Sequence, residues 1–155
     1  MLLTELLSAE RIRIPLTGQT KDELLEELVG VCADGNDIDD RADVLRAVRE
    51  REAVLSTGIG HGVAIPHGKS GAVSELRMAA GRSSEPVDFD ALDGEPVNLF
   101  FLLVGPESAA GPHIKALSRI SRLVRQDEVR QRLMTAQSAE EFLEALREAE
   151  TWQNT

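Results

Sequence analysis

The sequence predicts one three-layer domain of the α/β (α+β) class, in which a small mixed sheet lies between helices. Three observations lead to this fold. Several segments carry apolar residues at helical spacing behind capping signals, residues 11–16 alternate between polar and apolar, and residues 97–104 form a nearly continuous apolar run. The predicted element order is β-α-α-β-β-β-α-α-α, with the domain over residues 1–150 and a C-terminal tail over residues 151–155.

The composition argues against a nucleic-acid partner. The chain has 155 residues and a formal net charge of -10 at pH 7, and an acidic surface repels nucleic acid at long range. Aromatic residues make up 3% of the chain and Tyr is absent, so few rings can stack on bases. The acidity suits basic partners, or it only keeps the protein soluble.

The composition also predicts where in the cell the protein is located. The single Cys32 excludes an intrachain disulfide and falls on the apolar side of a predicted helix, as a buried thiol does. No apolar run approaches the ~20 residues that span a bilayer, and the N-terminal segment lacks the basic flank of a signal peptide. We therefore expect a cytoplasmic protein with no direct membrane insertion, and we expect no cofactor and no metal.

The N-terminal part predicts a short helical turn, a strand and a helix. The turn covers Leu2–Leu7, and the strand covers Arg11–Leu16, where Pro15 favours an end or edge of the sheet. Thr20 and Glu23 match a capping box, which starts an amphipathic helix. This helix reaches about Ala33, and its apolar face consists of Leu24, Leu25, Leu28, Val29 and Cys32.

A second helix follows over about residues 40–52. Residues 34–37 end the first helix, and Asp37 or Asp39 can cap the second. The second helix delivers Arg51 directly before a glycine-rich stretch. Its apolar stripe consists of Val44, Leu45 and Val48.

The middle of the chain predicts two strands around a turn-rich segment. Leu76–Gly81 and Val97–Val104 have strand length, and the second is apolar enough to be covered on both faces. Between them, residues 85–94 are rich in turn formers, with Phe89 and Leu92 expected to point inward.

Residues 105–112 form a flexible connection to three C-terminal helices. His113 opens a helix reaching about Gln126, Asp127 caps a short helix, and a capping box of Ser138 and Glu141 starts the last one. The residues expected to face the core are Ile114, Leu117, Ile120 and Val124, then Val129 and Leu133, then Phe142, Leu143 and Leu146.

The stretch Ser56–Lys69 holds four glycines, two histidines and one proline in fourteen residues, a density typical of a binding loop. Alternating glycines can let backbone N–H groups converge into an anion-binding nest. Pro66 fixes φ directly before His67, which we predict to be the reactive residue. The residues expected to support the loop or the phosphate are Ser56, Thr57, Gly58, Gly60, His61, Gly62 and Pro66.

These residue types suit phosphoryl transfer. A neutral imidazole is a good nucleophile for reversible group transfer near neutral pH. Arg51 lies just upstream, and an arginine can clamp phosphate oxygens. The reaction needs an in-line nucleophile, positive charge and N–H donors. The glycine spacing matches neither a Walker loop nor the dinucleotide fingerprint.

Arg51-Glu52 followed by Ser-Thr-Gly-Ile-Gly-His-Gly-Val-Ala-Ile-Pro-His-Gly resembles the enzyme IIA domains of the fructose/mannitol type in the bacterial phosphoenolpyruvate-dependent phosphotransferase system. Residues 89–97 resemble the middle section of that family, and residues 113–120 resemble its second histidine segment. The resemblance covers nearly the whole chain, so residues 1–150 are interpreted as an enzyme IIA type 2 domain. The stand-alone length and the middle section are most similar to the nitrogen-regulatory branch.

The resemblance implies a phosphotransferase component that works as a phosphoryl carrier or regulator. It implies a phosphate donor, either the carrier protein HPr or its nitrogen-branch counterpart. The acceptor corresponds to His67, modified on Nε2, with His113 as the second active-site histidine and Arg51 as the active-site arginine. Sugar-branch members pass the phosphate to a cysteine of enzyme IIB, whereas nitrogen-branch members mostly regulate other proteins. The resemblance also implies a mixed sheet between helical layers.

Several alternatives stay open. Many family members carry Asn where this chain has His61, so His61 is either a structural loop residue or part of the site. Three histidines could also form a zinc shell, which we consider the weaker interpretation. The basic row of Lys115, Arg119 and Arg122 is either a solvated helix face or a docking surface.

Two other function classes fit the same fold. One is a binding module that is not phosphorylated, and the presence of His67, His113 and Arg51 argues against it. The other is the cytoplasmic domain of an anion transporter, which the absence of an apolar spanning segment disfavours.

Overall fold

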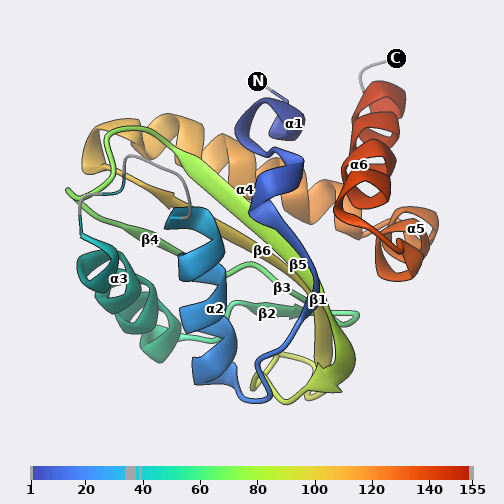
Figure 1. Ribbon diagram of the computed structural model, residues 1–155, viewed down its shortest axis with the longest axis horizontal. Helices are drawn as coiled ribbons and strands as arrows, with labels where there is room; N and C mark the ends of the chain where they lie inside the picture. The colour runs from blue at the N-terminus through green and yellow to red at the C-terminus, as the bar shows by residue number, and fades with distance from the viewer. Residues whose placement is uncertain (1, 34–37, 39, 154–155) are drawn as a thin grey trace.

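The computed structural model describes residues 2–33, 38 and 40–153, which form an open sheet with helices on both faces (Figure 1). The strands are β1 (Ile12–Leu16), β2 (Gly58–Gly60), β3 (Val63–Ala64), β4 (His67–Lys69), β5 (Arg77–Val87) and β6 (Val97–Gly105). The helices are α1 (Leu3–Leu6), α2 (Lys21–Ala33), α3 (Arg41–Val54), α4 (Ala110–Val124), α5 (Asp127–Thr135) and α6 (Ala139–Gln153), with 3-10 turns η1 (Ala9–Arg11) and η2 (Glu107–Ala109).

The sheet is mixed, as predicted. Its strands pair in the order β1-β5-β6-β3-β2, and β4 pairs with β6 as well. Strands β5 and β6 are antiparallel, whereas β1 is parallel to β5, and both β3 and β4 are parallel to β6. Strand β1, which contains Pro15, lies at an edge of this order, where a missing N–H is tolerated. The predicted α/β class with helices around a mixed sheet is confirmed.

Strand β6 separates two hydrophobic cores, because successive side chains of a strand point to opposite faces. One core packs against α1, α4, α5 and α6, and the other packs against α2 and α3 (Figure 1). The prediction that this apolar run is covered on both faces is confirmed. The first core takes Leu99, Phe101 and Leu103 from β6, and the second takes Phe100, Leu102 and Val104.

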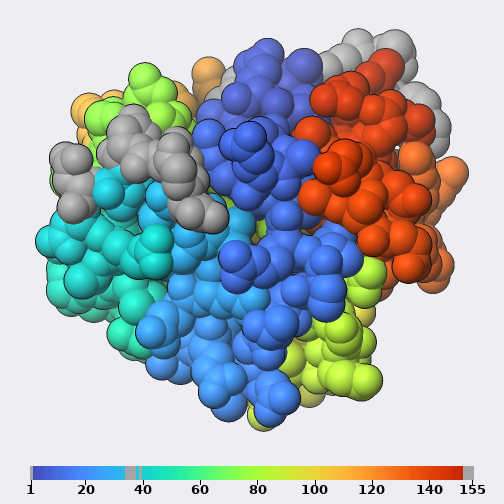
Figure 2. Space-filling view, in the orientation of Figure 1, coloured from blue at the N-terminus to red at the C-terminus, as the bar shows by residue number. Residues whose placement is uncertain are grey.

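The N-terminal helix α1 is tied to α6 by a buried carboxylate. Glu150 is 1% exposed and accepts the backbone N–H groups of Leu3 at 2.6 Å and Thr4 at 3.0 Å. The same carboxylate accepts Nε–H of Arg119 from α4 at 2.7 Å. Figure 2 shows the N-terminal segment in dark blue beside α6 in red.

The helix starts differ in detail from the predictions. Thr20 Oγ1 accepts the N–H of Glu23 at 3.2 Å, as a capping box requires, but the Glu23 carboxylate accepts the N–H of Gln19 instead of that of Thr20. At α6, Ser138, Glu141 and Gln137 repeat this pattern. The cap of α3 is Asp40, which accepts the N–H of Asp43 at 3.1 Å, and at α5 the N-cap residue is Gln126. The predicted caps Asp37 and Asp39 and the helix end at residues 34–37 lie outside the described residues.

Five strands lie between α3 and α4, where the sequence predicts three, because the glycine-rich stretch itself forms β2, β3 and β4. Strand β5 also runs on to Val87, through part of the segment predicted as turns, because β1 pairs with it as far as Ser83 and β6 pairs with it again at Val87. Phe89 is buried as predicted. Leu92 was expected to point inward, but it is 61% exposed. Only its backbone is tied to the sheet, because its N–H donates to the Gly58 carbonyl oxygen of β2.

Helix α4 begins at Ala110, before the predicted start at His113. Pro112 lies in the first turn, where its missing N–H leaves no intrahelical bond unmade. This start places His113 inside the helix and toward the core, while Ile114, predicted to face the core, is 66% exposed. At the other end, α6 runs through Gln153, past the position where the sequence predicts the tail to begin.

Candidate functional site

A pocket of about 420 Å³ lies where β4, the end of α3 and the start of α4 meet. It brings together the three residues that sequence analysis singles out for chemistry. Each comes from a different layer: Arg51 from α3, His67 from the sheet and His113 from α4. The full lining consists of Arg51, His67, Gly68, Lys69, His113, Ile114 and Leu117.

The backbone determines which nitrogen of His67 carries the proton. Nδ1 of His67 lies 2.9 Å from the Ile65 carbonyl oxygen, which can only accept a hydrogen bond. Nδ1 therefore donates, and the neutral ring keeps its lone pair on Nε2. Burial lowers the pKa of His67 below its usual value, and the charges of Arg51 and Lys69 lower it further, against the opposing effects of the Ile65 bond and Glu52. The ring is thus neutral and nucleophilic near pH 7.

His113 faces His67 edge to face. The ring centroids are 5.6 Å apart with an interplanar angle of 66°. His113 is 2% exposed, and both of its ring nitrogens lack a hydrogen-bond partner within the part of the chain that the structure describes. Burial, followed by the charges of His67 and Lys69, lowers the pKa of His113 to about 4. A neutral imidazole keeps one N–H, which is free to bond a group entering the pocket.

Two cations face the same space. Arg51 Nη1 donates to the Leu55 carbonyl at 2.9 Å, which holds the guanidinium at the end of α3. Lys69 lies two residues after His67 in β4, so both side chains leave the strand on the same face. Its ammonium is 4.0 Å from Glu107, a long ion pair at an exposed carboxylate. The pocket therefore offers positive charge and donors to an anion.

A buried carboxylate braces the segment that follows α3. Glu52 is 6% exposed, accepts both the N–H and the hydroxyl of Thr57, and pairs with Lys21 at 2.8 Å. Ser56 Oγ donates to the Phe89 carbonyl at 3.0 Å. Thus Ser56 and Thr57 support this segment without lining the pocket.

The glycine-rich stretch forms a hairpin at its start. His61 and Gly62 connect β2 to β3 and have φ values of 58° and 79°. Two-residue hairpin turns that match the twist of the strands require positive φ at both residues. The exposed His61 donates its N–H to Asp93 at 3.1 Å. At Gly58, a Cβ atom would lie 2.8 Å from the Cα atom of Ala91.

The structure does not bring this hairpin to the pocket. The residues Gly58, Gly60, His61, Gly62 and Pro66 are not among its lining. The expected anion nest at the alternating glycines is therefore replaced by a turn and by close packing. Pro66 is buried between β3 and β4, and its carbonyl accepts the N–H of Leu103 at 3.0 Å.

Sequence reasoning missed part of the lining. Gly68, Lys69, Ile114 and Leu117 were not predicted as site residues. A signal for two of them exists: Lys69 follows His67 at the two-residue spacing of a strand face, and Leu117 follows His113 at the four-residue spacing of a helix face. Ile114 was missed because its apolar side chain was assigned to the core-facing stripe of the helix, whereas it is 66% exposed.

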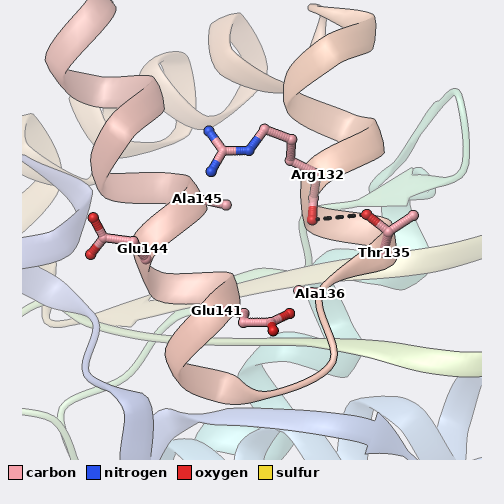
Figure 3. A pocket seen from close by; sticks show the side chains of 6 residues that line it. All are labelled: Arg132, Thr135, Ala136, Glu141, Glu144 and Ala145. Carbon is pink, nitrogen blue, oxygen red and sulfur yellow. Dashed lines mark hydrogen bonds between the residues drawn. The ribbon is translucent and has the colours of Figure 1, made fainter.

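Other sites differ from this pocket. A hollow of about 280 Å³ lies between α5 and α6 and is lined by Arg132, Thr135, Ala136, Glu141, Glu144 and Ala145. Figure 3 shows these side chains. Arg132 pairs with Glu148 at 2.6 Å, so its charge is compensated. Over residues 2–33, 38 and 40–153, no cluster of three or more His, Cys, Asp or Glu side chains could hold a metal ion. No helix in the same ranges is long and apolar enough to cross a bilayer.

The fold and the pocket define an α/β protein that presents a neutral imidazole beside two cations. Comparison with known proteins gives the family. Residues 5–149 match the family model described as "Phosphoenolpyruvate-dependent sugar phosphotransferase system, EIIA 2". The chain belongs to this family, whose members are phosphotransferase-system components that act as phosphoryl carriers or regulators.

Named relatives fall into two groups. The chain is 36% identical over 146 residues to a nitrogen regulatory protein of Bradyrhizobium diazoefficiens, covering 94% of this chain and 95% of the relative. It is also 36% identical over 146 residues to the fructose-specific EIIABC component of Bacillus subtilis, of which it spans 23%. The crystal structure of nitrogen regulatory protein IIA-Ntr from Neisseria meningitidis superimposes with a TM-score of 0.87 at 39% identity, covering 93% of this chain and 98% of that one.

Proposed function

We propose that His67 accepts a phosphoryl group on Nε2 from an HPr-type carrier protein, and that the chain then signals by its phosphorylation state. The Nε2 lone pair attacks phosphorus as the donor's phosphorus–nitrogen bond breaks, and the released electron pair stays on the donor imidazole. One phosphorus–nitrogen bond forms and one breaks, so the step needs no further reactant.

A single observation carries this proposal. The 2.9 Å contact of His67 Nδ1 with the Ile65 carbonyl leaves Nε2 as the nucleophilic atom of the ring. The pocket around it supplies what a phosphoryl group needs. Arg51 and Lys69 contribute positive charge, and His113 contributes an unused N–H.

The test is transfer of labelled phosphate from phosphoenolpyruvate through the first enzyme of the system and an HPr-type protein. We expect one acid-labile phosphate per chain, lost in His67→Ala. His61→Ala is the matched control, because it removes a histidine that does not line the pocket. Labelling of His67→Ala at the wild-type level would contradict the assignment.

The nitrogen-regulatory role is supported by two relatives of that name. The Bradyrhizobium nitrogen regulatory protein is 36% identical over 146 residues, and the Neisseria IIA-Ntr structure superimposes with a TM-score of 0.87 at 39% identity. Binding of regulated proteins should therefore depend on phosphorylation. Identical partners captured by wild type and by His67→Glu would count against this role.

The alternative is a sugar-specific IIA protein that passes phosphate to a cysteine of enzyme IIB. The fructose-specific name of the Bacillus relative supports it. Rapid, complete transfer from the labelled chain to a purified fructose-type IIB protein would favour this alternative. The cytoplasmic location, and the division of the chain into a domain and a tail at residue 150, stay predictions.

A further inference from the structure

Helix α3 and strand β4 contact each other at three levels, and the first of these lies outside the pocket. At the first level, Ser70 Oγ, directly after β4, donates to Asp43 Oδ2 in the first turn of α3 at 2.5 Å. At the second level, Gly68 lies so close to α3 that a Cβ atom there would stand 3.0 Å from the backbone nitrogen of Val48.

The pocket forms the third level, where Arg51 of α3 and His67 of β4 lie together. Residue numbers rise along the helix as they fall along the strand, so the two elements run antiparallel. Asp43, Ala47 and Arg51 recur every four residues and therefore share one side of α3. The Asp43–Ser70 bond thus lies at one end of the contact between α3 and β4, and Arg51 and His67 lie at the other end.

The partners of this bond are themselves fixed. Ser70 is 5% exposed, its hydroxyl also accepts the N–H of Ala72 at 3.1 Å, and its own N–H donates to the Gly105 carbonyl at 3.0 Å. Asp43 is held in the helix by its N–H bond to Asp40. The two contacts act differently. The close approach at Gly68 sets how near the helix lies, whereas a directional hydrogen bond opposes sliding of the helix along the strand.

We propose that the Asp43–Ser70 hydrogen bond positions Arg51 against His67 by fixing α3 lengthwise on β4. Asp43 and Ser70 touch no reacting atom, so both are positioning residues. The consequence for phosphoryl transfer rests on the proposed function of His67. The geometric consequence, a displaced Arg51 when the bond is removed, does not.

The first test uses no phosphate donor. The charged and titratable groups around the His67 ring are Arg51 and Glu52 from α3, Lys69 from β4 and His113 from α4. Because the charge of Arg51 lowers the pKa of His67, Ser70→Ala should raise that pKa in an NMR titration as Arg51 recedes. Arg49→Gln is the control, since it removes the ion pairs of α3 with Asp22 and Glu26 and touches neither Asp43 nor Ser70. An unchanged pKa in Ser70→Ala overturns the proposal.

The second test is kinetic. A misplacement of ~1 Å can lower a rate by ~100-fold, so we expect Ser70→Ala and Asp43→Ala each to lower kcat for phosphorylation by about tenfold, with the KM for the donor little changed. Because both variants remove the same bond, the double variant should lose no more than either single one. Losses that multiply, or a full kcat in folded variants, contradict the proposal.

The outcomes separate the two hypotheses. If wild type is not labelled on His67, the proposed function fails. If wild type is labelled and the variants match it, the positioning role alone fails. Should Ser70→Ala not fold, Asp43→Asn against Asp43→Ala gives the same comparison, because the Asn side chain still offers an acceptor to the Ser70 hydroxyl.

Discussion

The Ile65 carbonyl gives His67 its chemical character, although it belongs to the backbone and leaves no trace in the residue types. It fixes the proton on Nδ1 at 2.9 Å and directs the lone pair to Nε2. Burial and two neighbouring cations then keep the ring neutral. His113 is neutral for the same reasons. The site is therefore a pair of neutral imidazoles beside the two cations Arg51 and Lys69.

The pH dependence of phosphorylation should follow His67. Its pKa is lowered from the usual 6.5, and the neutral ring is the reactive form, so the rate should be level near pH 7 and should fall only in more acidic solution. Lys69→Gln removes a charge that lowers this pKa, so the midpoint of the pH–rate profile should move to higher pH. Rates measured at saturating donor check this, with Lys115→Gln on an exposed part of α4 as control. A midpoint that stays fixed or moves down in Lys69→Gln would refute the Coulomb argument.

His113 should make the protein sensitive to acid. The pKa of this ring is about 4 in the folded chain and 6.5 when unperturbed, so the unfolded state binds the proton first as the pH falls. Stability should drop between pH 6.5 and 4, by roughly 3 kcal/mol from this residue. His113→Leu should flatten the pH dependence of the unfolding free energy over that window. Denaturant titrations at several pH values measure it, and an equally steep loss in the variant would show that other groups dominate.

The site residues could be predicted to different degrees. His67 and Arg51 stand beside a dense glycine motif, so residue types and family resemblance both indicated them, whereas the resemblance alone indicated His113. The sequence could not predict that the rings of His67 and His113 face each other, or how deeply each ring is buried. Those properties depend on the crossing of β4 and α4, which are separated by more than forty residues in sequence.

At the scale of elements, the β2–β3 hairpin explains the glycine-rich stretch without an anion. Its turn residues need positive φ, which glycine adopts freely and which Asn or His tolerates better than most side chains. This conformational need accounts for His61 where many family members carry Asn. The residue is placed by the turn, and Asp93 accepts its backbone N–H whichever side chain is present.

His61 variants should therefore separate by backbone preference rather than by chemistry. At φ 58°, His61→Val should cost ~1–2 kcal/mol of unfolding free energy, because a β-branched side chain crowds the left-handed region. His61→Asn should be as stable as wild type, and both variants should still accept phosphate on His67. Equilibrium denaturation and labelling measure the two effects. Loss of labelling in a folded His61→Asn protein would show that the His61 side chain takes part in phosphorylation of His67.

Element boundaries were predicted less well than element types. Burial is directly visible in the apolar run of β6 and in the apolar stripes of α2 and α6, so the sequence predicted these three elements correctly. Strand β5 was ended too early and α4 was started too late, because residues 85–94 were predicted as turns and residues 105–112 as a flexible connection. The strand tolerates Pro86 at a register shift, and the first turn of the helix tolerates Pro112. Ile114 was expected in the core because its apolar side chain was assigned to the buried stripe of α4, but that side of the helix contains His113, Ala116 and Ile120 instead.

At the scale of the whole molecule, the pocket is the place where all three layers contribute a functional side chain. Arg51 belongs to the helical layer over one core, His113 belongs to the layer over the other core, and His67 lies in the sheet between them. Each core packs against its own face of β6. A group bound in the pocket can therefore link the two helical layers directly.

Phosphorylation should accordingly tighten both helical layers at once. A phosphoryl group on His67 would accept hydrogen bonds from Arg51 on one side and from the unpartnered His113 ring on the other. Hydrogen exchange should slow at the end of α3, near residues 51–57, and at the start of α4, near residues 110–117, while α5 serves as the internal control. In Arg51→Ala the protection near α3 should be lost and that near α4 retained. Protection confined to α4 in the wild-type protein would mean that Arg51 does not reach the phosphoryl group and that the two layers are not linked through it.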